Sequence, residues 1–167
     1  MEAVMGLGGT LGKLKEAEIP ADSPAREEFY LNNMKTLFLL AAGNAAQKFG
    51  QELTNEQEVL CRLADMAMEI FAAESGLLRA KKMVAAGENE ESELAMLMTK
   101  CFIHEMIPKM EAWAKEVIVG TLEGDAAGKA YAGIKLLTRY EPMNIFAPKR
   151  DIADAVYQGK KYFLDRM

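Results

Sequence analysis

The sequence predicts an all-α protein: an antiparallel four-helix bundle with a short fifth C-terminal helix and an irregular N-terminal segment. Apolar residues recur at intervals of three, four and seven, and no segment shows the sustained alternation of a half-buried strand. Glycines and prolines interrupt this pattern where short loops would join helices. A length of 167 residues is typical of one domain, which we divide into a linker over residues 1–22 and a bundle over residues 23–167.

The ends of the first two helices follow from local signals. A serine followed by proline begins the first helix, which we place at residues 23–49, and Gly50 stops it. The second helix is placed at residues 54–86, because its first four residues, TNEQ, match the capping box Ser/Thr-x-x-Glu/Gln. Gly87 then ends it.

Fewer sequence signals support the remaining helices, but each has a signal at one of its ends. An acidic run opens the third helix, placed at residues 88–122, where it suits the positive end of the helix dipole. The fourth helix, at residues 125–140, begins with an aspartate that can cap it. Pro142 and Pro148 bracket an irregular link, and a short fifth helix follows at residues 149–158.

The second helix carries two adjacent apolar seams. The first seam consists of Val59, Leu63, Met66, Ile70 and Leu77, and the second of Leu60, Ala64, Ala67, Phe71 and Leu78. Together they make a wide stripe, as expected of a helix packed against two neighbours. Arg62 and Asp65 are three residues apart and can form an ion pair. Glu74 falls on the first seam, so we expect an arginine, either Arg79 or Arg139, to pair with it.

The first helix is apolar almost all round over residues 36–46, with Leu37, Phe38, Leu39 and Leu40 in succession. Four consecutive residues cover a full helical turn, so they cannot all face one neighbour. A bundle of four helices encloses only the inner side of each. We therefore expect a symmetric homodimer with the first helix at or beside the interface, because large exposed apolar patches are rare on monomers.

Composition excludes several classes of function. A net charge of −5, a pI near 5.1 and the lack of a basic stripe exclude nucleic acid as an expected partner. The longest strongly apolar run, residues 37–46, is too short to span a bilayer, and no secretion signal opens the chain, so we expect a cytoplasmic protein. Cys61 and Cys101 lack metal-type spacing and are interpreted as reduced core residues. The 12 methionines are interpreted as core filling.

We predict no catalytic, cofactor-binding or metal-binding residue in these 167 residues. A ferritin-like di-iron site needs two Glu-x-x-His pairs, whereas His104 is the one histidine and Cys101 precedes it by three. Asp65, Glu69 and Glu74 do not share one helix face, which disfavours a carboxylate site. A Cys101–His104 contact is possible on one helix, but no third group completes a nucleophilic site, so a structural role for His104 is favoured.

The N-terminal stretch MGLGGTLGKL, residues 5–14, comes close to a phosphate-binding loop. That loop needs glycine, four residues, then Gly-Lys-Ser/Thr. Leu7 stands at the first glycine position and Leu14 replaces the hydroxyl residue. The stretch is better interpreted as a flexible entry into the domain.

Three segments resemble the C-terminal helical extension of long- and very-long-chain acyl-CoA dehydrogenases. The stretch NEQEVLCRLADMAMEIFAAESGLLRA, residues 55–80, resembles a segment of that extension. The earlier stretch TLFLLAAGNAAQKFG is similar to its preceding helix, and NIFAPKRDIADAVYQGKKYF is similar to the way bacterial members end. The likeness covers about residues 25–165, and the turn LTNEQ followed by RLADM is its most specific part.

The resemblance implies an accessory domain. Enzymes of this family oxidise fatty acyl-CoA thioesters with a glutamate base and FAD as hydride acceptor, on domains that these 167 residues do not contain. It implies a C-terminal helical domain for docking or oligomerisation in a flavin-dependent enzyme of fatty acid β-oxidation, whose catalytic domains hold the FAD. The chain would be either an excised domain or a stand-alone relative. The alternative is a free-standing helical interaction module that binds a protein partner or a membrane surface.

Overall fold

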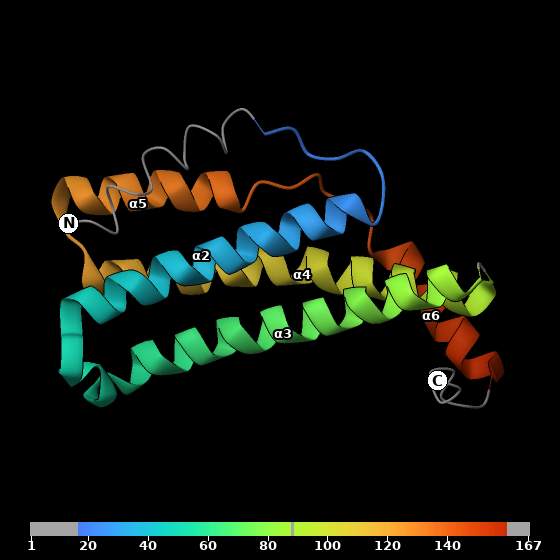
Figure 1. The fold of residues 1–167 in the computed structure, drawn as a ribbon, viewed down its shortest axis with the longest axis horizontal. Helices are drawn as coiled ribbons and strands as arrows, with labels where there is room; N and C mark the ends of the chain where they lie inside the picture. Colours follow the sequence, from blue (N-terminus) through green and yellow to red (C-terminus); the bar gives the residue numbers. More distant parts are fainter. Residues whose placement is uncertain (1–16, 88, 160–167) are drawn as a thin grey trace.

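The computed structural model describes residues 17–87 and 89–159, and the regular structure within these ranges is helical throughout (Figure 1). The elements are α2 (Ala25–Phe49), the 3₁₀ helix η1 (Gly50–Asn55), α3 (Gln57–Ala86), α4 (Glu90–Thr121), α5 (Gly124–Leu137) and α6 (Phe146–Gly159). The predicted all-α class is confirmed. The glycine-rich stretch at residues 5–14 lies outside the described residues, and the division at residue 22 stays a prediction.

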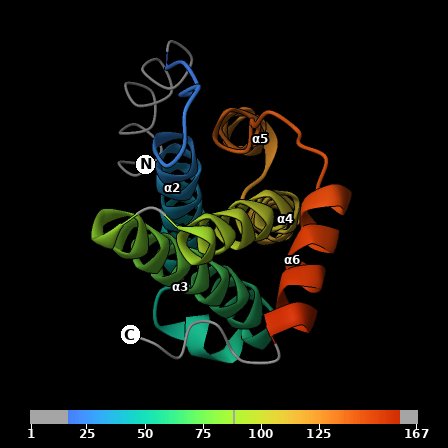
Figure 2. The ribbon, with the colours of Figure 1, turned by 90° about the vertical axis from the view of Figure 1, so that its right-hand side faces the viewer.

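The helices α2, α3, α4 and α5 run in alternating directions, as expected of an antiparallel bundle (Figure 1). Helix α4 is at the centre of the fold, because it contacts α2, α3, α5 and α6. In the end-on view, α5 lies beside α2 and α4, and α6 lies across the outer side of α4 (Figure 2). In the described part of the chain, α3 contacts only α2, α4 and η1.

The core is filled by large apolar side chains from α2 to α5. Its fully buried members include Met34, Leu37, Met66, Ile103, Met106, Ile107, Met110, Ile118, Ile134 and Leu137. Four methionines in this set fill the core, as predicted, whereas Met68, which was also predicted to be core filling, is 61% exposed. Leu63 and Ile70, from the first seam of α3, are 8% and 9% exposed. The first seam is therefore core, as predicted.

The second seam of α3 is not buried. Leu60, Phe71 and Leu78 are 37%, 74% and 60% exposed, and Ala64 and Ala67 are exposed as well. The prediction of a wide buried stripe was wrong because both neighbours of α3, α2 and α4, pack against its first seam. The opposite side of α3 has no neighbour among the described residues. We name these five exposed residues the α3 stripe.

Helix α2 is more enclosed than its sequence predicts. Leu37, Leu40 and Ala41 are buried and Phe38 is half-buried, so most of the apolar run packs inside the domain. Leu39, at 68% exposed, is the exception. The unfinished apolar surface of this fold therefore lies mainly on α3, with one contribution from α2.

The start of α3 differs from the predicted capping box. Gly50 has φ of 55°, a left-handed value that glycine adopts without strain, and this turns the chain into η1. The Thr54 hydroxyl donates to the carbonyl of Gln51 at 3.2 Å instead of capping a helix. Helix α3 begins only at Gln57, without a side-chain cap. A short 3₁₀ helix has taken the place of the first turn.

A capping box does occur at α4, where the sequence pattern was not recognised. The Ser92 amide donates to Asn89 Oδ1 at 2.9 Å, and the Asn89 amide donates to Ser92 Oγ at 3.0 Å. Asparagine and serine perform here the reciprocal exchange that Ser/Thr and Glu/Gln usually perform. The acidic residues Glu90, Glu91 and Glu93 lie in the first turn, as predicted from the dipole.

Two further helices begin one or two residues away from their predicted starts. Pro24 occupies the N-cap of α2 without a side-chain cap hydrogen bond, so Ser23 does not cap that helix. Helix α5 begins at Gly124 and ends at Leu137, so Asp125 lies in its first turn rather than before it. Glycine with φ of 56° at position 124 sets the sharp entry into α5.

Helix α6 begins earlier than predicted and is loosely attached. It starts at Phe146, so Pro148 lies in its first turn instead of in the preceding link. Proline is tolerated there because the first amides of a helix have no partner within the helix. No residue of α6 in the described range is buried, and an ion pair between Lys149 and Glu105 joins it to α4.

Candidate functional site

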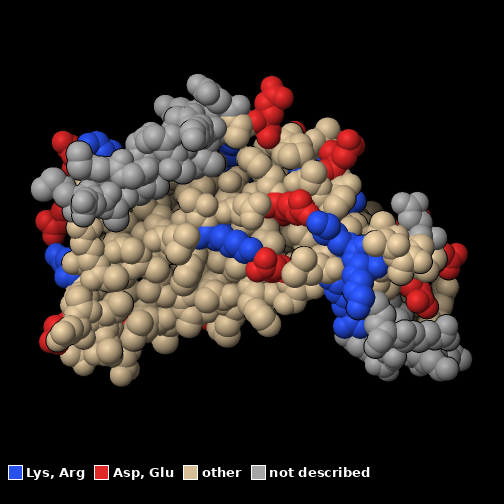
Figure 3. All heavy atoms as spheres, in the orientation of Figure 1, with Lys and Arg blue, Asp and Glu red and all other residues tan. Residues whose placement is uncertain are grey.

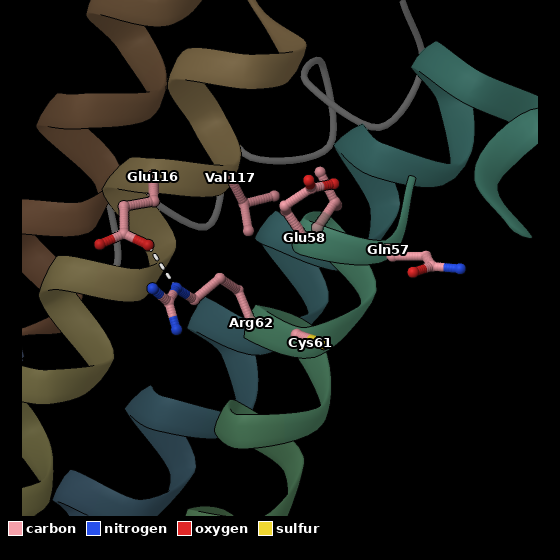
Figure 4. A pocket seen from close by; sticks show the side chains of 7 residues that line it. Gln57, Glu58, Cys61, Arg62, Glu116 and Val117 are labelled. Atoms are coloured by element: carbon pink, nitrogen blue, oxygen red, sulfur yellow. Dashed lines mark hydrogen bonds and ion pairs between the residues drawn. The ribbon is translucent and has the colours of Figure 1, made fainter. Parts of the chain in front are cut away.

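A cleft of about 430 Å³ lies between the start of α3 and the end of α4 (Figure 4). Arg62 from α3 crosses it and binds Glu116 of α4, and it also pairs with Asp65 at 3.3 Å, which confirms the predicted Arg62–Asp65 contact. The hydrogen bond that Arg62 donates to Glu116 raises the pKa of Arg62 above its ordinary value. Because two carboxylates neutralise this guanidinium, the cleft offers no spare positive charge to an anionic ligand among its described residues.

Cys61 lies at the edge of the same cleft and is exposed, so the prediction of a core cysteine is wrong for this residue. Cys61 lies next to Leu60 of the second seam, on the side of α3 that neither α2 nor α4 covers. Cys101 is buried, as predicted. Burial raises the pKa of the Cys101 thiol, which keeps it in the unreactive protonated form at neutral pH.

His104 lies in a buried aromatic cluster. Its ring is 5.7 Å from the ring centres of both Tyr30 and Tyr140, in edge-to-face geometry. Burial lowers the pKa of His104, and the nearby carboxylate of Glu27 partly opposes this shift. Its Nδ1 atom has no hydrogen-bond partner within the described structure, and no hydrogen bond joins it to Cys101 there. A neutral histidine packed between tyrosines supports the structural role that the sequence favoured.

The same cluster joins α2 to the segment after α5. The amide of Glu141 donates to the Tyr30 hydroxyl at 3.1 Å, while Tyr30 itself is 1% exposed. Burial raises the pKa of Tyr30. Tyr30, His104 and Tyr140 thus tie three segments together, and the chemistry available to them is packing rather than proton transfer to a ligand.

The carboxylates of α3 are separated from one another by their partners. Glu74 pairs with Lys35 of α2, so the expected partners Arg79 and Arg139 were wrong. A lysine was not foreseen because the sequence does not tell which residue of α2 reaches this turn of α3. Glu69 pairs with Lys109 of α4 at 2.9 Å. Arg139 instead donates to the backbone carbonyl of Ala17.

These ion pairs leave no metal centre in residues 17–87 and 89–159, where no group of three His, Cys, Asp or Glu side chains is placed to hold an ion. Glu74 pairs with α2, Glu69 with α4, and Asp65 with Arg62 of α3 itself. Within the same ranges, no helix is long and apolar enough to cross a membrane. The conspicuous surface feature is the α3 stripe, whose residues the sequence pattern predicted to be buried.

By its fold, this chain is an all-α bundle domain in which several ion pairs join neighbouring helices. It belongs to the family described as acyl-CoA dehydrogenase, C-terminal domain, whose family model matches residues 33–135. The predicted family is therefore confirmed at this level. The narrower assignment to long- or very-long-chain enzymes stays a prediction.

Two relatives illustrate the match. A probable acyl-CoA dehydrogenase of Bacillus subtilis (strain 168) is 35% identical over 137 residues, which is 82% of this chain and 23% of the relative. The crystal structure of an acyl-CoA dehydrogenase complexed with FAD from Bacillus anthracis aligns with a TM-score of 0.84 and 31% identity, over 95% of this chain and 27% of that one. This chain thus spans about a quarter of the length of the two relatives.

Proposed function

We propose that this chain is the accessory helical domain of a flavin-dependent acyl-CoA dehydrogenase of fatty acid β-oxidation, and that it serves docking and oligomerisation rather than catalysis. The main support is the FAD-bound relative from Bacillus anthracis, of which only 27% aligns with this chain. The catalytic domains and the FAD then belong to the larger remainder of such an enzyme. Long- or very-long-chain acyl-CoA is the substrate class proposed for that enzyme, with a cytoplasmic location and a homodimeric assembly.

Two clefts formed by described residues do not fit FAD. The cleft between the start of α4 and α6 measures about 740 Å³ and is lined by Glu90, Glu91 and Glu93, with Lys100 as the cation beside them. These carboxylates would repel the diphosphate of the cofactor. In the cleft of Figure 4, Arg62 is already held by two carboxylates. We therefore derive no chemical step through a flavin in this chain.

The purified chain is expected to be colourless and inactive toward acyl-CoA with an artificial electron acceptor. The absorbance of an oxidised flavin at about 450 nm provides the first measurement, because the redox chemistry belongs to the cofactor. The second measurement removes the matching segment from the Bacillus subtilis relative. The truncated relative should still bind flavin, but it should form smaller oligomers or unfold at a lower temperature. Stoichiometric flavin on the isolated chain would contradict an accessory role.

The alternative function, a free-standing module that binds a membrane surface, has one observation in its favour. Helix α6 exposes Phe146 and Tyr157, at 71% and 87%, next to the cations Lys149 and Arg150. Aromatic side chains beside basic ones are typical of helices that lie in a membrane interface. Flotation with vesicles that contain anionic lipids tests this alternative, and Tyr157→Ser should abolish any binding through α6.

A further inference from the structure

The α3 stripe is the largest run of exposed apolar side chains that follows one helix in the described structure. Phe71 and Leu78 are 74% and 60% exposed, and Met68, beside the stripe, is 61% exposed. The lower part of the face in Figure 3, where Figure 1 shows α3, carries few charged side chains. Contiguous apolar surface of this kind usually marks a protein interface.

We propose that the α3 stripe binds the same stripe of a second copy of this chain, and that the two α3 helices pack antiparallel about a twofold axis. The inference rests on the homodimer proposed above and names its surface. Sequence alone placed this interface on α2, but Leu40 and Ala41 of α2 are buried within the domain.

The stripe is complementary to itself in the antiparallel orientation. Suppose that the twofold axis crosses the helix pair at the level of Glu69. A residue that lies a given number of positions before Glu69 is then opposite the residue that lies the same number of positions after Glu69 in the second copy. Leu60 then faces Leu78 of the second copy, and Ala67 faces its Phe71. The small side chain of Ala67 leaves room for the aromatic ring, so each copy supplies a knob and a hole. Symmetric interfaces require this kind of self-complementarity.

Charge also favours the antiparallel orientation. The N-terminal end of α3 carries Glu56, at its N-cap, and Glu58, and its C-terminal end carries Lys82 beside Lys81, which pairs with Glu28 of α2. An antiparallel pair brings the acidic end of one helix to the basic end of the other, whereas a parallel pair brings like charges together. The helix dipoles oppose each other favourably in the same arrangement.

The size of the stripe indicates a weak dimer. At a rise of about 1.5 Å per residue, Leu60 and Leu78 are about 27 Å apart along α3. Leu39 can add to the contact, because it lies one turn after Lys35, which pairs with Glu74 beside the stripe. Stable interfaces bury roughly 800 Å² per partner. A single helix face with one flanking residue provides less, so we expect dissociation on dilution in the micromolar range.

Sedimentation velocity over a dilution series tests the surface. The wild-type chain should shift from dimer to monomer on dilution, and Phe71→Lys should weaken dimerisation by at least about tenfold, since it places a cation in the apolar contact. Val119→Lys is the matched control, because Val119 is 67% exposed and belongs to α4 rather than to the stripe. Circular dichroism checks that both variants stay helical. A monomeric wild type, or a dimer unaffected by Phe71→Lys, would overturn the proposal.

Thiol cross-linking tests the orientation. In a Cys61→Ser background, chains with Leu60→Cys and chains with Leu78→Cys are treated with a short bifunctional thiol reagent, separately and mixed. An antiparallel dimer gives the cross-linked species only in the mixture, because each cysteine faces the other position. Cross-links within either single variant would indicate a parallel pair and overturn the geometry. None of these outcomes changes the flavin measurements, so failure of the interface is distinguishable from failure of the accessory role.

Discussion

Leu77 and Leu78 are adjacent in α3 and allow one substitution to be compared in two environments. Leu77 is 2% exposed and belongs to the first seam, whereas Leu78 is 60% exposed on the α3 stripe. Leu→Ala removes three carbon atoms in both cases and changes helix propensity equally. At about 0.8 kcal/mol per buried CH₂, the transfer cost at Leu77 is about 2.4 kcal/mol. The cavity left behind raises the expected total to about 3–5 kcal/mol.

The free energy of unfolding is measured by urea titration, with helicity followed by circular dichroism at a concentration where the chain is monomeric. Leu77→Ala should lower it by about 3–5 kcal/mol, while Leu78→Ala should change it by less than about 0.5 kcal/mol. Leu63→Ala and Ile70→Ala should each cost about 2–5 kcal/mol for the same reason. Equal effects at Leu77 and Leu78 would contradict the assignment of the first seam to the core and of the second seam to the surface.

Two other predictions concern a buried ring and a helix cap. Burial lowers the folded-state pKa of His104, so the unfolded chain binds a proton first as pH falls through about 6.5. The free energy of unfolding should therefore decline below that pH. His104→Phe should reduce this decline, as measured by urea titrations at pH 7.5 and 5.5. An identical pH dependence in that variant would refute the assignment. Asn89→Ala should lower the free energy of unfolding by about 1 kcal/mol because it removes the α4 capping box, whereas Thr54→Ala should be nearly neutral. If Thr54→Ala lowered the melting temperature more than Asn89→Ala, Thr54 would be the helix cap after all.

The sequence could predict the helices and the inner face of α3, because spacing of apolar residues reports directly on helical periodicity. It could not assign the outer face. Leu63 and Leu60 occur in seams with similar spacing, and only the positions of α2 and α4 decide which seam is covered. A local pattern also misled at Thr54, where the turn at Gly50 begins a 3₁₀ helix that no spacing rule anticipates.

For the candidate site, the sequence indicated which side chain needs a partner but not which residue provides it. The single histidine and the scattered carboxylates predict no metal centre, and this stays a prediction. The need of Glu74 for a cation followed from its place on the apolar seam, but its partner, Lys35, depends on how α2 and α3 cross. Exposure of Cys61 has the same origin, since it follows from the uncovered side of α3.

The attachment of α6 has a consequence for the cooperativity of the domain. Helices α2, α3, α4 and α5 share one core, but α6 contributes no buried side chain and, among the described residues, contacts α4 alone. Opening α6 therefore exposes little apolar surface, and its amide protons can exchange with solvent without melting of the core. The domain thus contains two units of unequal local stability: a bundle that unfolds as a whole, and a terminal helix that can detach and return while the bundle stays folded.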